Sequence, residues 1–196
     1  MIYDEVQYTK NDWRNRNKIK TQNGLIWLTI PVKQKFLDQR ICETEVVDQS
    51  WRKKHLKTIE FNYSKAPHFK EFFPLIKYMY EGDEKFISHI NLKFIRNICL
   101  FLEIKTEIID SRELLLNGDK NERLVDACKK LGASTYLSGK AALNYLNLDL
   151  FNKNNIQIEW MDYSHLTEYP QLFHPFQNEV SIIDTMLNKG KRDIFC

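Results

Sequence analysis

The second half of the chain alternates between helical and strand-like hydrophobic patterns, and this alternation restricts the possible folds most. The predicted helices span residues 85–104, 121–133 and 140–148, and the predicted strands span residues 105–110, 134–139 and 156–160. Strands separated by helices of this length pair in parallel through right-handed crossovers. The pattern therefore predicts an α/β fold, a Rossmann-like three-layer sandwich with a mainly parallel sheet.

The first half adds a different pattern. Residues 24–32 and 41–48 are rich in β-branched side chains and are separated by a polar connector, so we expect them to pair as an N-terminal β-hairpin. Residues 50–63 place apolar positions at helical spacing, and two more helices are predicted over residues 68–82 and 179–190. A chain of 196 residues with 43% hydrophobic residues can bury one core, which predicts a single α/β domain over residues 1–196.

Several classes of protein are disfavoured by the composition. The longest apolar runs are much shorter than the roughly 20 residues of a membrane helix, and no apolar signal core begins the chain. We therefore expect a cytoplasmic protein without membrane insertion. The four cysteines are widely scattered without a C-x-x-C pair, which argues against a disulfide framework and against a zinc site.

The positive charge is concentrated in the first 80 residues, which hold 15 Lys and Arg against 9 Asp and Glu, although the whole chain has a net charge of +3. An anionic partner is expected at that end. Residues 6–20 contribute five basic residues and Trp13 without a helical or strand period, so this stretch is expected to lie outside the core. A nucleic-acid partner is not predicted, because Asp4, Glu5 and Asp12 interrupt the basic track and favour a defined pocket.

Two further segments carry candidate chemistry. Ser138 and Gly139 lie at a predicted strand-to-helix turn, where glycine admits a ligand and helix amides bind an anion, although a tight turn capped by Ser138 explains the pattern equally. Neither the P-loop spacing nor the G-x-S-x-G spacing is present.

The second segment, residues 54–69, groups side chains that donate or exchange protons, namely His55, Tyr63, Lys65 and His68. His55 shares a helical stripe with Trp51, so a packed histidine is the alternative to a catalytic one. His68 follows a proline in a predicted loop and is freer to meet a ligand. Neither histidine has a metal-like H-x-x-x-H partner, and no metal site is predicted.

Five segments resemble successive signatures of the WbqC-like family, in matching order and over nearly the whole chain. They are DEVQYTKNDWRNRNKIK, WLTIPV, KHLKTI with YSKAPHF, YLSGKAALNYL, and SIIDTMLNKG. The family is associated with bacterial surface-polysaccharide (O-antigen) gene sets. The resemblance implies a role in making or decorating nucleotide-linked amino sugars, by an acyl- or aminoacyl-transferase that forms an amide on the sugar amine.

This implied substrate gives roles to the candidate residues. A diphosphate needs planar, bidentate donors such as Arg14 and Arg16, while Trp13 is suited to stack on a base or sugar and Asn15 to bind hydroxyls. His68 or His55 is the expected general base, and backbone amides near the Ser138 turn are expected to stabilise the oxyanion. The predicted substrate-binding residues are Asp12, Trp13, Arg14, Asn15, Arg16, Tyr63, Lys65, Ser138 and Gly139.

The resemblance leaves the donor and two other classes of function open. Direct acyl transfer from a thioester would use coenzyme A or an acyl carrier protein as donor. Family members begin with an additional strand and loop that bear His-Gln-Pro and Tyr-Leu-Pro-Trp, whereas here Met1 stands three residues before Asp4, so we expect that element to be missing. The alternatives are a nucleotidyl-transferring or adenylate-forming enzyme with a divalent metal, and a non-catalytic nucleotide-sugar-binding subunit.

Overall fold

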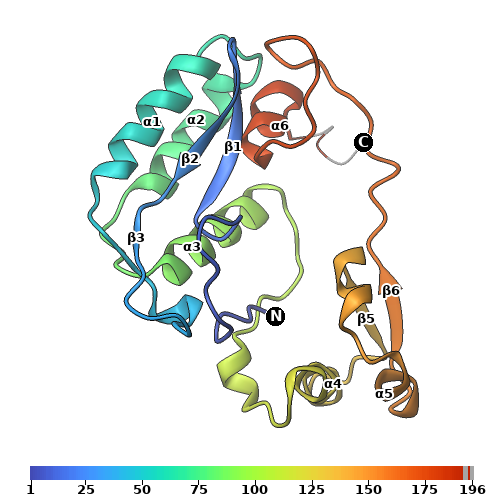
Figure 1. Ribbon diagram of the computed structural model, residues 1–196. Coiled ribbons are helices and arrows are strands. Elements are labelled where there is room, and N and C mark those ends of the chain that lie inside the picture. The colour runs from blue at the N-terminus through green and yellow to red at the C-terminus, as the bar shows by residue number, and fades with distance from the viewer. Residues whose placement is uncertain (192–193, 195–196) are drawn as a thin grey trace. The chain divides into compact units, whose positions relative to one another are not determined.

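The computed structural model describes residues 1–191 and residue 194, and its secondary structure is mixed α and β (Figure 1). The chain packs as two compact units. The small unit consists of residues Met1–Tyr3 and Glu107–His165, and the large unit consists of Asp4–Thr106 and Leu166–Cys196. Each unit has its own hydrophobic core. The single domain over residues 1–196 stays a prediction.

The large unit contains two antiparallel strand pairs. Strand β1 (Arg16–Thr21) pairs with β2 (Gly24–Thr29), with Ile19 opposite Ile26, and the short β3 (Val32–Lys33) pairs with β4 (Glu45–Val46). The expected hairpin between residues 24–32 and 41–48 is therefore only partly right, because β2 pairs with the preceding strand. Only the ends of the two predicted segments, β3 and β4, pair with each other.

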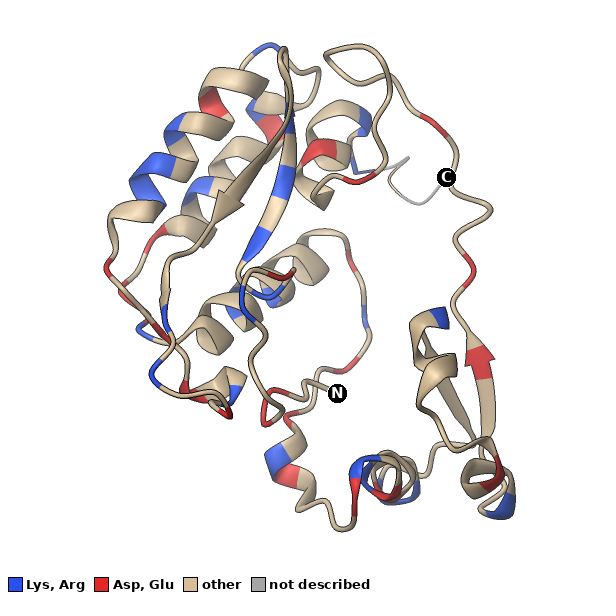
Figure 2. Cartoon of the chain, viewed as in Figure 1, with Lys and Arg blue, Asp and Glu red and all other residues tan. Residues whose placement is uncertain are grey.

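Strand β1 corrects the prediction that residues 6–20 lie outside the core. Ile19 is fully buried, and Asn15 and Lys20 are buried as well. The alternation of polar and apolar residues that is typical of a strand is not visible in the sequence, because the polar Lys20 is buried. Its stem is packed inside, and its Nζ donates to Gln171 Oε1 (2.8 Å), 151 residues away. Basic side chains nevertheless follow one another along β1, as Figure 2 shows.

Four α-helices complete the large unit: α1 (Ser50–Tyr63), α2 (Phe69–Tyr80), α3 (Ile87–Phe101) and α6 (Ile182–Lys189). Helix α1 has the predicted bounds, since its apolar stripe of Trp51, Ile59 and Tyr63 is buried. Helices α1 and α2 pack on each other, and α1 and α6 both contact β1 (Figure 1). In α6, Ile183, Met186 and Leu187 are buried, whereas Ile182 is 37% exposed.

The small unit contains a parallel strand pair with two helices. Helix α4 (Lys120–Lys130) begins at a capping box formed by Asp119 and Glu122. Strands β5 (Thr135–Ser138) and β6 (Gln157–Trp160) pair in parallel, and α5 (Leu148–Lys153) is part of the segment that connects them. Its core is formed by Val125, Cys128, Ala142, Leu146, Phe151 and Ile156. The parallel pairing of these two strands is confirmed.

Two other predictions for this half of the chain are wrong. Residues 105–109 form no strand, and Asp110 makes a single bridge with Ile2. Residues 140–144 form a 3-10 helix instead of the first turns of an α-helix. Among the described residues the strands form three two-stranded sheets, so a Rossmann-like sandwich is not confirmed and the fold is α/β in the coarser sense. No helix in residues 1–191 is long and apolar enough to cross a membrane.

Candidate functional site

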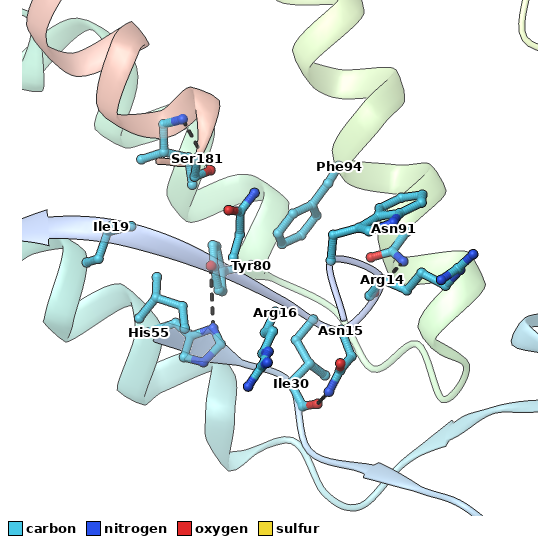
Figure 3. A pocket seen from close by; sticks show the side chains of 14 residues that line it. Arg14, Asn15, Arg16, Ile19, Ile30, His55, Tyr80, Asn91, Phe94 and Ser181 are labelled. Carbon is cyan, nitrogen blue, oxygen red and sulfur yellow. Dashed lines mark hydrogen bonds between the residues drawn. The ribbon is translucent and has the colours of Figure 1, made fainter. Parts of the chain in front are cut away.

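A pocket of about 160 Å3 lies in the large unit, between the β1–β2 hairpin and helices α1, α2, α3 and α6 (Figure 3). It is lined by Trp13, Arg14, Asn15, Arg16, Asn17, Ile19, Leu28, Ile30, His55, Tyr80, Asn91, Phe94, Ser181 and Ile183. None of these residues is acidic, and two are arginines. An anion inside this pocket would therefore meet positive charge without a competing carboxylate in the lining.

The pocket brings together five of the predicted site residues and leaves six elsewhere. Trp13, Arg14, Asn15, Arg16 and His55 line it. Asp12 sits beside it as the partner of Arg14. Tyr63, Lys65 and His68 of the large unit are not among its lining residues, and Ser138 and Gly139 belong to the small unit.

The lining residues from α2, α3 and α6, among them Tyr80, Asn91 and Ser181, were not predicted from the sequence. Each lies on a helix or at a helix start whose neighbouring positions are apolar. Their sequence spacing from residues 13–16 exceeds 60 residues, so no local pattern connects them. These residues come together around the pocket only because α2, α3 and α6 pack near the β1–β2 hairpin.

Arg14 is already engaged within its own loop. Its guanidinium forms an ion pair with Asp12, whose Oδ1 also accepts from the Arg14 backbone N–H (2.9 Å). The guanidinium carbon lies 4.9 Å from the Trp13 ring centroid, and Figure 3 shows the side chain directed away from His55 and Tyr80. Asp12 therefore offsets the charge of Arg14 and fixes the loop that carries Trp13.

Arg16, unlike Arg14, has no counter-ion among the described residues. Its guanidinium carbon stacks 4.1 Å from the Trp27 ring centroid, and Nε is buried without a hydrogen-bond partner in the described part of the chain. Stacking on an indole face holds the guanidinium plane and leaves its N–H edges available. Arg16 is therefore prepared to donate in its plane to a bidentate acceptor such as a phosphate.

His55 is held between two partners at the base of the pocket. Nε2 lies 3.1 Å from the Thr29 carbonyl oxygen, and the Tyr80 hydroxyl lies 3.5 Å from Nδ1 (Figure 3). Burial lowers the pKa of His55 to about 4, so the ring is neutral at pH 7. The carbonyl contact requires the proton on Nε2, and Nδ1 therefore accepts from Tyr80. This arrangement favours a positioning role, and general-base catalysis by His55 stays a prediction.

Tyr63 belongs to a buried hydrogen-bond network instead of the pocket. Its hydroxyl donates to Asp184 Oδ2 (2.6 Å) and accepts from the Lys20 backbone N–H (2.9 Å). Asp184 Oδ1 accepts from the Tyr169 hydroxyl (2.8 Å) and from Gln171 Nε2 (2.9 Å). Burial, as the largest cause, raises the pKa of Tyr63 far above its usual range, which makes proton exchange near pH 7 unfavourable. The network joins β1, α1, α6 and residues 169–171.

His68 lies at the carboxyl end of α6 instead of in the pocket. Its backbone N–H donates to the Leu187 carbonyl (3.0 Å), and its Nδ1 lies 3.1 Å from Glu71 Oε2. A Cβ atom at Gly190 would come within 2.4 Å of the ring. These contacts explain His68 by packing, whereas its catalytic role stays a prediction. Lys65 is exposed on the surface.

Ser138 and Gly139 end strand β5 in the small unit. Gly139 has an extended backbone (φ −71°, ψ 149°) and precedes a 3-10 helix, and no atom lies within 4 Å of where its Cβ would be. Neither a positive φ nor a close approach therefore requires glycine there. In residues 1–191 and 194 no group of three His, Cys, Asp or Glu side chains is suited to hold a metal ion.

Comparisons with known proteins place the chain in a family. The profile of the WbqC-like protein family matches residues 1–195. The chain is 40% identical over 192 residues to the uncharacterized protein Rv1507c of Mycobacterium tuberculosis, an alignment that covers 97% of this chain and 83% of that protein. No solved structure matches the chain significantly. The resemblance detected in its sequence segments is thereby confirmed, and the chain belongs to the WbqC-like protein family.

Proposed function

We propose that the large unit binds a nucleotide-linked amino sugar in this pocket and that the chain transfers an acyl or aminoacyl group to the sugar amine, in bacterial surface-polysaccharide (O-antigen) biosynthesis. The observation that carries the proposal is Arg16. It lines a pocket without acidic residues, stacks on Trp27, and has a buried Nε without a partner in the described residues. A diphosphate supplies the acceptors and the charge that this guanidinium lacks.

The size of the pocket decides which part of such a ligand it holds. Its volume of about 160 Å3 is below the roughly 300–1,000 Å3 typical of pockets that enclose a whole ligand. The diphosphate with the sugar fits the pocket better than the complete molecule does. The base is then expected to lie outside, where Trp13 is 76% exposed and offers a face for stacking.

The proposed reaction is aminolysis of a thioester. The sugar nitrogen attacks the thioester carbonyl, a C–N bond forms, the C–S bond breaks, the thiolate leaves, and the nitrogen releases a proton to a base. Coenzyme A or an acyl carrier protein is the proposed donor. His55 is a weak base while its pKa is about 4, but an anionic diphosphate beside it would raise that pKa and so increase its basicity.

Isothermal titration calorimetry with nucleotide-linked amino sugars tests the binding step. We expect Arg16→Ala to weaken binding by about tenfold or more, because a charge-assisted hydrogen bond is lost. Arg96→Ala is the matched control, since Arg96 is an exposed arginine on α3 outside the pocket. Equal affinities of Arg16→Ala, Arg96→Ala and the unchanged chain would refute the proposed site.

A non-catalytic nucleotide-sugar-binding subunit is the second candidate. It is favoured by the surroundings of the two predicted catalytic histidines, because His68 is not among the lining residues of the pocket and both ring nitrogens of His55 already have partners. An amine-acylation assay with a coenzyme A thioester and an acyl carrier thioester separates the two. If binding depends on Arg16 but neither thioester yields an amide, the result would support the non-catalytic binding subunit over the transferase.

A further inference from the structure

One polar atom in the pocket lining is buried without a partner and is not explained by anion binding. Asn15 is 3% exposed and lines the pocket, and its Oδ1 has no hydrogen-bond partner in the described part of the chain. A buried amide oxygen that accepts nothing is unfavourable by about the desolvation cost of the group. The free chain therefore keeps an acceptor ready beside Arg16.

The orientation of this amide is fixed by Ile30, which directly follows strand β2. Asn15 Nδ2 donates to the Ile30 carbonyl (3.1 Å), as Figure 3 shows, and the Ile30 backbone N–H donates to the Asn15 carbonyl (2.8 Å). Rotating the amide by half a turn would place two oxygens against each other and lose the Nδ2 bond. Asn15 Oδ1 is consequently held as an acceptor and cannot exchange its role with the nitrogen.

We propose that Asn15 determines the specificity of the pocket: its Oδ1 accepts a hydrogen bond from the amine of the sugar, while Arg16 holds the adjacent diphosphate. The inference rests on the proposed function and adds the chemical group that the sugar must present. A sugar with an N–H donor satisfies the buried acceptor. A sugar with a ketone at the same carbon brings a second acceptor, leaves Oδ1 unpaired and is rejected.

Matched ligands test this on the unaltered protein. The probes are nucleoside-diphosphate deoxyhexoses that carry either an amine or a ketone at C3 or at C4, together with the nucleoside diphosphate alone, measured by calorimetry. We expect the amine of one pair to bind at least about tenfold more tightly than its ketone. The side-chain amide resonances of Asn15, observed by NMR, are expected to shift with that amine and not with the ketone.

A variant supplies the second arm. Asn15→Leu has a similar size and no acceptor, so we expect it to lose the preference for the amine over the ketone. Should that variant fail to fold, the NMR measurement on the unaltered chain decides.

Two outcomes would overturn the inference: one refutes only the role of Asn15, and the other refutes the proposed function as well. Amine and ketone binding within about twofold in both pairs, with dependence on Arg16 retained, refutes the role of Asn15 and indicates that water satisfies Oδ1. Absence of binding for every probe, the nucleoside diphosphate included, refutes the proposed function as well.

Discussion

The large unit buries many polar side chains, whereas the small unit buries almost none. Of the buried polar and charged side chains in the described residues, Ser111 lies in the small unit and the others, including Asn15, Lys20, His55 and Asp184, lie in the large unit. Burying such groups is costly unless each finds a hydrogen-bond partner, so their partners fix the local geometry. A site that binds a polar ligand selectively is therefore expected in the large unit.

The small unit is built in a different way. Its core consists of six buried apolar residues, whereas the core of the large unit includes Phe72, Ile76, Met79 and many others. An apolar core of that size gives little stability and no arrangement of fixed donors and acceptors. From this comparison we expect the small unit to unfold before the large one.

The largest expected effects come from truncating each core. Phe72 in the large unit and Phe151 in the small unit are both fully buried. Changing either to alanine should cost about 3–5 kcal/mol of unfolding free energy. In hydrogen exchange, Phe151→Ala should release protection only within residues 107–165, whereas Phe72→Ala should destabilise the large unit. Loss of protection in both units after Phe151→Ala would instead support a single cooperative domain.

The buried network of the large unit gives the next largest effect. Asp184→Ala removes the acceptor for Tyr63, Tyr169 and Gln171 and should lower the unfolding free energy by about 3 kcal/mol, because hydrogen bonds to a charged group are lost. Tyr63→Phe removes one of those donors and should cost about 1–2 kcal/mol. Urea denaturation of both variants checks the order. Equal losses would show that Asp184 is not the centre of the network.

Local patterns predicted the elements that depend on a single apolar stripe. Residues 50–63 form a helix with the predicted bounds because Trp51 and Ile59 lie on one face, and the parallel strands near residues 135 and 157 were predicted from their own composition. Trp13, Arg14, Asn15 and Arg16 line one pocket, since adjacent residues in one loop and strand reach the same space, and their role in substrate binding stays a prediction.

The remaining features depend on contacts between distant residues. Strand β1 was not predicted because Lys20 is polar in sequence, and its burial depends on hydrogen bonds from Nζ to Gln171 and to the Pro175 carbonyl. Arg14 and Arg16 looked equivalent, yet Asp12 pairs with Arg14 and leaves Arg16 without an ion pair in the described residues. His68 stood in a suggestive local pattern, but its contacts with Leu187 and Glu71 are tertiary and local, respectively, and neither involves the pocket lining.

The pH dependence of stability tests the burial of His55. Burial lowers its pKa from 6.5 to about 4, so between these values the unfolded chain binds a proton that the folded chain does not. Above pH 6.5 neither state is protonated, and the contribution is absent. As pH falls from 6.5 to 4, stability should therefore fall by about 2–3 kcal/mol more than in His55→Gln. Parallel curves for the two proteins would contradict the burial of a neutral ring.

A glycine in the large unit gives a smaller effect. Gly190 has a φ of +81°, and an added Cβ would meet the His68 ring at 2.4 Å. Gly190→Ala should cost about 1–2 kcal/mol, partly through backbone strain and partly through this clash. Removing the ring with His68→Ala should recover part of the loss in the double variant, as thermal unfolding would show. Strict additivity of the two changes would mean that His68 does not pack on Gly190.

The corresponding glycine in the small unit should give the smallest effect. Gly139 is extended at φ −71°, and a Cβ there would meet no atom within 4 Å, so alanine fits the backbone without strain. Gly139→Ala should raise the unfolding free energy by about 0.4–1 kcal/mol through the reduced entropy of the unfolded chain. Nucleotide-sugar affinity should stay unchanged, because the pocket lies in the large unit. Weakened binding in calorimetry would indicate that the Ser138–Gly139 turn takes part in ligand binding, and that binding is not confined to the large unit.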